Sequence, residues 1–261
     1  METHVRKLHI GSEAQKGEAA KELRKLARDA ANRQPIVDAG GVPPLVVLVK
    51  GGTDAHKEQA AHALANLALD DAIRKHIVDA GGVPPLILLV ERGNEKQKEN
   101  AAAALASLAV DAANKKLIGG AGGVPPLISL VESGTDSVKE KAAAALRNLS
   151  REATNRKPIG DAGGIPPLIA LVRSGTNTQK EHAAGALASL ARDAAIRKTI
   201  IDAGGLPPLI LLVETGTDSQ KEKASVALRN LDTDDTDEKR IADAGGLLPL
   251  VQVRGGTLFR A

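Results

Sequence analysis

The apolar positions of the chain are spaced as on three successive helices, and this three-helix pattern recurs in blocks of 41 residues. In the block 70–110, the residues predicted to face inward on the first, second and third helices are Ile73 and Ile77, then Leu86, Leu89 and Val90, then Ala101, Leu105 and Leu108. Spacings of three, four and seven residues place such side chains on one face of a helix. The pattern therefore predicts an all-α fold with three helices in each block.

A glycine pair separates the first predicted helix from the second. The pairs begin at Gly40, Gly81, Gly122, Gly163, Gly204 and Gly245. At Gly81-Gly82, glycine accepts the positive φ that ends a helix, and Pro84 suits the first turn of the next helix, where its missing amide hydrogen is not needed. A fixed period of 41 residues indicates a solenoid of stacked repeats.

Polar pairs predict where the third helices begin. In each pair a capping residue stands three positions before a glutamine, which is a capping-box spacing. The pairs are Ser12 with Gln15, Asn94 with Gln97, Thr176 with Gln179, and Thr217 with Gln220. Because residues 11–26 match residues 52–67 one period later, we expect a single array over 1–261. It comprises a partial repeat at 1–28, five full repeats at 29–233 and a truncated repeat at 234–261.

Composition limits which residue types can form the core and which cellular compartment fits the protein. With 43% apolar residues, one Phe, no Trp and no Tyr, the core must consist of Leu, Ile, Val and Ala. The absence of Cys fits a reducing compartment, so the cytoplasm is the default location and the nucleus the alternative. Because 35 basic and 32 acidic residues nearly balance, we expect no nucleic-acid partner. No apolar run has the length of a transmembrane segment.

The sequence offers no arrangement typical of a catalytic, metal or cofactor site. The histidines His4, His9, His56, His62, His76 and His182 neither recur with the period nor have the spacing of zinc ligands. No phosphate-binding loop, nucleophile elbow or acid pair is present. We therefore expect a protein that is not an enzyme and uses no cofactor.

Three helices in about 40 residues, a Gly-Gly-Val-Pro-Pro-Leu corner and a third helix reading Ala-Ala-Ala-Ala-Leu-Ala-Ser-Leu resemble the armadillo repeat. The sequence of the repeats is most similar to the arrays of vacuolar-membrane armadillo adaptors and plant U-box ubiquitin ligases. The resemblance covers nearly the whole chain and implies a right-handed α-solenoid. It also implies a concave groove, lined by the third helices, that binds an extended peptide.

In armadillo proteins a Trp four residues before an Asn commonly grips that peptide. The resemblance places the Asn position at Asn66, Ser107, Asn148, Ser189 and Asn230. The corresponding Trp positions hold His62, Ala103, Ala144, Gly185 and Val226. An amide can bond both the donor and the acceptor of a peptide backbone, so the Asn residues are candidate clamps. The missing Trp residues argue against recognition of the nuclear-import type.

Charged residues extend the candidate groove. A recurring glutamate lies on the same helical face as the Asn or Ser eight residues later: Glu58, Glu99, Glu140, Glu181 and Glu222. An acidic binding stripe is one interpretation, and pairing with the preceding lysines in solvent is the other. The C-terminal part of the groove is basic, with Lys141, Arg147, Arg151, Arg192, Lys223 and Arg229. Equivalent places in the N-terminal part hold Gln59, Asn100, Leu69 and Val110. We therefore expect the partner's charge to change along its length.

The leading hypothesis is a protein–protein interaction scaffold that binds an extended segment of a partner in this groove. One alternative, from resemblance alone, is the substrate-recognition part of a ubiquitin ligase. Another is a basic-edge binder of nucleic acid or acidic membrane, based on a second ladder on the first helices. That ladder comprises Arg74-Lys75, Lys115-Lys116, Arg156-Lys157, Arg197-Lys198 and Lys239-Arg240.

The ends of the array lead to a further expectation. Apolar residues there have no obvious cover, so we expect end-to-end self-association. These residues are Leu23 and Leu26 at one end and Leu247, Leu250, Val251 and Val253 at the other, with Leu258 and Phe259 as a candidate lid.

Overall fold

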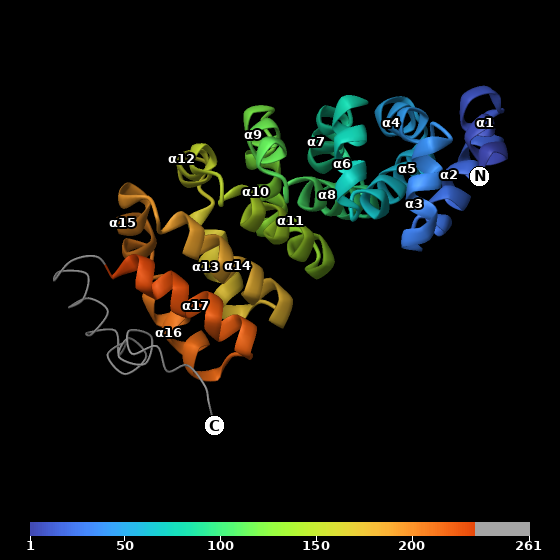
Figure 1. Cartoon of the computed structure of the whole chain (residues 1–261). Helices are drawn as coiled ribbons and strands as arrows, with labels where there is room; N and C mark the ends of the chain where they lie inside the picture. Colours follow the sequence, from blue (N-terminus) through green and yellow to red (C-terminus); the bar gives the residue numbers. More distant parts are fainter. Residues whose placement is uncertain (233–261) are drawn as a thin grey trace. The chain divides into compact units, whose positions relative to one another are not determined.

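The computed structural model of the protein describes residues 1–232, which form seventeen α-helices and no strand (Figure 1). The chain divides into two compact units, one ending at Leu130 and the other beginning at Val131, within α10. The helices confirm the all-α prediction.

The first unit contains α1 (Glu2–Ile10), α2 (Glu13–Leu26), α3 (Ala30–Asp38), α4 (Val42–Gly51), α5 (Asp54–Leu67), α6 (Asp71–Asp79), α7 (Val83–Arg92), α8 (Glu95–Leu108), α9 (Ala112–Gly120) and most of α10 (Val124–Ser133). The second contains the end of α10, then α11 (Asp136–Leu149), α12 (Ala153–Asp161), α13 (Ile165–Ser174), α14 (Asn177–Leu190), α15 (Ala194–Asp202), α16 (Leu206–Thr215) and α17 (Asp218–Leu231).

The third helices of successive repeats pack side by side within each unit. In the first unit α5 lies between α2 and α8, and in the second α14 lies between α11 and α17 (Figure 1). Each second helix packs on the third helix of its own repeat, as α7 does on α8 and α13 on α14. This stacking places one face of every third helix at the surface of its unit.

The corner between first and second helices has the predicted geometry. Gly81 has a φ of 74°, and the equivalent glycines of the other described repeats have φ between 76° and 81°. The amide of Gly82 bonds to the carbonyl of Ile77 at 2.9 Å, which closes the first helix. A Cβ on Gly82 would lie 2.8 Å from Ile77 Cγ2, so this second glycine provides room for the helix end. Pro84 lies in the first turn of α7, as expected.

The core consists of aliphatic side chains, as composition requires. The inward-facing residues predicted for the block 70–110 are all buried. The four predicted capping boxes, at Ser12, Asn94, Thr176 and Thr217, are all present.

One prediction about the ends is wrong. Leu23 is fully buried and Leu26 is partly buried, because α1 packs on α2 and contributes buried Val5 and Leu8. The apolar residues predicted to be exposed at the other end, Leu247, Leu250, Val251, Val253, Leu258 and Phe259, lie outside the described residues.

Candidate functional site

The predicted groove residues all lie on third helices. In the first unit, Glu58 and Asn66 are on α5 and Glu99 and Ser107 on α8. In the second unit, Glu140, Arg147 and Asn148 are on α11, Glu181 and Ser189 on α14, and Glu222, Arg229 and Asn230 on α17. All of them are at least half-buried except Glu222 and Arg229, which are exposed.

The asparagines join neighbouring third helices. Asn66 Nδ2 donates to the backbone oxygen of Arg24 on α2 at 3.1 Å, and Asn230 Nδ2 donates to that of Ala188 on α14 at 2.8 Å. An Asn side chain has two amide hydrogens and one acceptor oxygen. A peptide clamp at these positions would therefore use the second hydrogen and the oxygen.

A second set of links was missed by the sequence analysis, which treated its members only as helix caps. Gln97 Nε2 donates to the backbone oxygen of Asp54 at 3.0 Å while its Oε1 accepts from the amide of Asn94 at 3.0 Å. The equivalent bonds are Gln179 to Asp136 and Gln220 to Asn177, both at 2.8 Å. The sequence does carry a signal for these links, because a glutamine recurs at the third position of α8, α14 and α17.

The recurring glutamates are largely neutralised. Glu99 lies 2.9 Å from Lys96 Nζ, Glu140 2.7 Å from Lys141 Nζ, Glu222 2.8 Å from Lys223 Nζ, and Glu181 3.7 Å from Arg147 Nη1. The first three pairs lie within one helix, and the fourth joins α11 to α14. The interpretation as paired surface charges thus describes four of the five residues, with different partners from those expected.

A polar cavity of about 360 Å³ opens on the third-helix face of the second unit. Its lining residues are Arg147 and Arg151 from α11 and its end, Gly185, Ala188, Ser189 and Arg192 from α14 and its end, and Glu222, Lys223 and Val226 from α17. We call it the third-helix cavity. Of the predicted site residues, the structure brings Arg147, Ser189 and Glu222 together here, whereas Arg229 and the asparagines do not line it.

Arg147 is the most constrained cation of this cavity. Its Nη1 donates to His182 Nδ1 at 3.1 Å, and its Nε is buried without a hydrogen-bond partner among residues 1–232. Burial lowers the pKa of Arg147, and the nearby positive charge of Arg151 lowers it further. Burial and then Arg147 lower the pKa of His182, so this histidine favours the neutral form that accepts the Arg147 hydrogen.

Gly185 allows the Arg147 stem to lie against α14. A Cβ at this position would be 3.0 Å from Arg147 Cδ and 3.2 Å from Arg147 Cγ. Because Gly185 stands where the resemblance expects a Trp, the lost aromatic is replaced by an arginine stem from the neighbouring helix.

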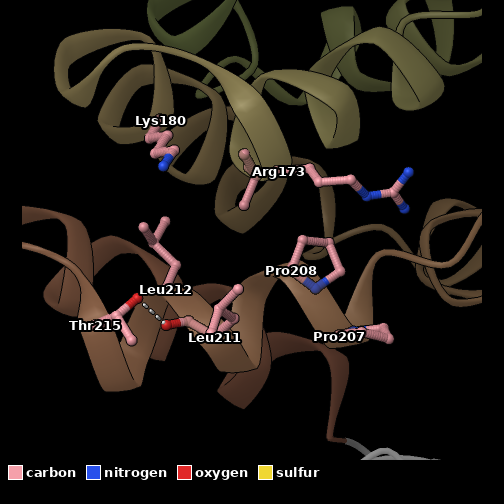
Figure 2. A pocket seen from close by; sticks show the side chains of 8 residues that line it. Arg173, Lys180, Pro207, Pro208, Leu211, Leu212 and Thr215 are labelled. Carbon is pink, nitrogen blue, oxygen red and sulfur yellow. Dashed lines mark hydrogen bonds between the residues drawn. The ribbon is translucent and has the colours of Figure 1, made fainter.

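A smaller cavity, of about 200 Å³, lies between the second helices α13 and α16 of the same unit (Figure 2). It is lined by Val172, Arg173, Lys180, Pro207, Pro208, Leu211, Leu212 and Thr215. Figure 2 shows Thr215 bonded to the Leu211 carbonyl on one wall, at 2.8 Å. A cavity of about 160 Å³ with equivalent residues, such as Lys57, Pro85 and Leu88, occurs in the first unit. Its recurrence indicates a crevice that repeat stacking generates.

The arginines of the basic ladder on the first helices make bonds within the fold. Arg74 is only 6% exposed, and its Nε donates to the backbone oxygen of Ala68 at the end of α5 at 2.9 Å. Arg33, Arg156 and Arg197 bond the ends of their preceding third helices in the same way. Lys75 pairs with Asp79, and Lys157 with Asp161, both at 2.6 Å. These contacts weaken the basic-edge alternative, because they occupy much of the charge it needs.

Within residues 1–232, neither a metal site nor a membrane-spanning helix is found. No cluster of three or more His, Asp or Glu side chains there could hold a metal ion. Within the same residues, every helix is too short or too polar to cross a membrane.

Comparisons with known structures agree with this architecture. An engineered protein solved by the Northeast Structural Genomics Consortium is 36% identical; the match covers 98% of this chain and 64% of that one, with a TM-score of 0.91. A second engineered protein from the same consortium is 36% identical over 88% of this chain and 95% of its own, with a TM-score of 0.83. A designed armadillo repeat protein, solved in complex with the peptide (KR)4, has the same fold at 23% identity and a TM-score of 0.80, covering 88% of this chain and 99% of its own.

Among curated protein sequences, none matches the chain. The sequence model of the armadillo/β-catenin-like repeat does match, at residues 29–69, 70–110, 111–151, 153–192 and 193–231. These five spans carry the helices α3 to α17, whose order and corners are those of the resemblance noted above. The chain therefore belongs to the armadillo/β-catenin-like repeat family and is an armadillo α-solenoid scaffold.

Proposed function

We propose that the protein is a non-enzymatic scaffold whose third helices bind an extended segment of a partner protein. The observation that carries this proposal is the third-helix cavity, which opens on the face formed by α11, α14 and α17 and is lined by charged and small residues. Small residues such as Ala188 and Ser189 let a peptide backbone approach the helices closely. Charged neighbours can then fix its side chains.

The solved neighbours support this use of the fold. One designed armadillo repeat protein was solved in complex with the peptide (KR)4, and others were designed computationally for modular peptide recognition. The cavity of the present chain carries cations, so we do not extend that basic peptide to it. The Cys-free composition supports a reducing compartment, and we assign the scaffold to the cytoplasm on that ground.

The test is selection of linear peptides on the full chain from a random phage library, followed by fluorescence anisotropy with the selected peptides. Val226 lines the third-helix cavity and Leu211 lines the second-helix cavity, so Val226→Trp and Leu211→Trp fill one cavity each. We expect the first variant to change Kd by about tenfold or more and the second to leave it unchanged. Failure to select any linear peptide would overturn the proposal, as would an effect confined to Leu211→Trp.

Asn66 and Asn230 are unsuitable for this test. Their amides also bond to neighbouring third helices, so substituting them would alter stability together with binding.

A further inference from the structure

We infer that the third-helix cavity is a carboxylate site, which takes Asp or Glu side chains of the partner's extended segment. The inference rests on the proposed function and adds the chemistry of the partner. The juxtaposition that carries it is of Arg147, Arg151, Arg192 and Lys223 around one cavity.

The cavity has more positive than negative charge. Four cationic side chains face one carboxylate, that of Glu222, which leaves a net charge of three positive units (4 − 1). Glu222 is already 2.8 Å from Lys223 Nζ. Within residues 1–232, neither Arg151 nor Arg192 has an acidic partner for its guanidinium. Two exposed cations at the rim therefore have no acidic partner in this part of the chain.

Arg147 adds an under-compensated charge beneath the rim. Its guanidinium is partly withdrawn from water, meets Glu181 only at 3.7 Å and bonds to a neutral imidazole instead of a carboxylate. Desolvation and a like-charged neighbour both disfavour a cation, and a bound anion opposes both effects. Arginine also presents several donors in a plane that matches a carboxylate.

The corresponding face of the first unit, formed by α2, α5 and α8, carries only part of this charge. Three periods before Arg147 and Arg151 stand Arg24 and Arg28. The positions of Arg192 and Lys223 are occupied there by Leu69, which is 55% exposed, and by Asn100. Of these two corresponding faces, only that of the second unit therefore has all four cations.

The cavity suits a peptide better than a polynucleotide. Binding of single-stranded nucleic acid relies on aromatic side chains on which bases stack. The chain has no Trp or Tyr, and its single Phe, Phe259, lies outside the described residues. Charge without a stacking platform favours carboxylates on an extended protein segment.

The inference is tested on the full chain by anisotropy with three fluorescein-labelled peptides of equal length. They consist of Gly and Ser interrupted regularly by Glu, by Gln or by Lys. We expect the Glu peptide to bind about tenfold more tightly than the Gln peptide and the Lys peptide not to bind, with the difference shrinking as salt rises.

A pair of charge-reversal variants with equal net charge supplies the test and its matched control. Arg151 and Arg192 are exposed at the third-helix cavity, and Arg173 and Lys180 line the second-helix cavity of the same unit. The double variant R151E/R192E should weaken binding of the Glu peptide about tenfold or more, whereas R173E/K180E should leave it within about twofold. Equal losses in both variants would show nonspecific attraction and overturn the assignment.

Failure of the inference and failure of the proposed function give different results. If library-selected peptides bind at Val226 but the Glu and Gln peptides bind equally, the carboxylate site is wrong and the scaffold function stands. If no peptide responds to Val226→Trp, the proposed function itself fails. Tighter binding of a single-stranded DNA oligonucleotide than of the Glu peptide, lost in R151E/R192E, would also overturn the inference in favour of a nucleic-acid site.

Discussion

Replacement of Arg74 by Met tests whether the first-helix arginines hold the repeats together. In the structure, Arg74 Nε donates to the Ala68 carbonyl at 2.9 Å, and Nη1 donates to Asp111 Oδ1 at 2.9 Å. Nη2 lies 2.7 Å from Asp71 Oδ1. The side chain thus bonds the end of one third helix and the start of the next repeat. Methionine keeps an apolar stem of similar length and removes only the charged group.

The expected loss follows from these three contacts. A hydrogen bond from a charged donor to a buried carbonyl is worth about 1.5–3 kcal/mol. Asp71 is 88% exposed and Asp111 39% exposed, so these ion pairs add little, about 0–1 kcal/mol in total. We therefore expect Arg74→Met to lower the free energy of unfolding by about 2–3 kcal/mol.

The assay is urea unfolding followed by far-ultraviolet circular dichroism, with Lys75→Met as the matched control. Lys75 is the adjacent residue, and its ammonium group pairs with Asp79 on an exposed surface, so its loss should cost about 0.5 kcal/mol or less. Arg197→Met should give an intermediate loss, because the bond from Arg197 to the Ala191 carbonyl is long, at 3.5 Å. If Arg74→Met and Lys75→Met are equally stable, the arginine does not link the repeats and the argument fails.

Three further predictions concern glycine, glutamine and histidine positions. Gly82→Ala should destabilise the chain by about 2–3 kcal/mol, because the new Cβ would lie 2.8 Å from neighbouring atoms. Gly81→Ala should cost only about 1–2 kcal/mol, because Gly81 has a φ of 74° but lies in open space. Equal urea midpoints for the two variants would contradict this order. Gln97→Ala should cost about 2 kcal/mol, since it leaves the Asp54 carbonyl and an amide without their partner, and a thermal midpoint unchanged from the parent would count against it. The pKa of His182 is lowered in the folded chain, so as pH falls the imidazole is protonated first in the unfolded chain. The free energy of unfolding should therefore decrease as pH drops below about 6.5. Over the same pH range, the urea midpoint of His182→Gln should decrease less than that of the parent. An identical decrease in the parent and the variant would show that His182 does not titrate as argued.

The helices and their corners could be predicted because the signals lie within a few residues of one another. Gly81, Gly82 and Pro84 fix a chain reversal through backbone preferences alone, and Leu105 and Leu108 reveal a buried face by their spacing. Such information is local, and it is repeated five times along the chain. The fold could therefore be predicted from the sequence alone.

The candidate site was only partly accessible. The sequence identified Arg147 and Ser189 as third-helix residues, but the cavity also requires Gly185 to leave space beside the Arg147 stem. That space depends on the distance between α11 and α14, which no spacing rule gives. The burial of Leu23 was missed for a similar reason, because it depends on how α1 packs on α2.

The links between third helices were hidden because one partner in each is a backbone atom. Gln97 bonds to the carbonyl of Asp54, and Asn66 bonds to that of Arg24, and a carbonyl is present whatever the side chain is. The Arg24 position therefore carries no sequence signature for the Asn66 link. The glutamines also donate to a side-chain Oδ1, that of Asp54, Asp136 or Asn177, at 3.2, 3.4 and 3.3 Å. The donors are visible in the sequence, but each had another explanation, Gln97 as a helix cap and Asn66 as a peptide clamp.

These glutamine links also bear on how such a chain can change in length. The side chain of Gln220 reaches the Asn177 carbonyl 43 residues earlier, and Gln179 reaches that of Asp136 across the same interval. Any residue can supply the accepting backbone oxygen, and Asp136 and Asn177 add a second acceptor, their side-chain Oδ1, at 3.4 and 3.3 Å. A loss or duplication of one whole period in the gene would place a new carbonyl in front of the same glutamine. The backbone part of each glutamine link thus does not depend on which repeat precedes it, so the number of repeats can change while surface residues such as Arg151 and Arg192 vary separately.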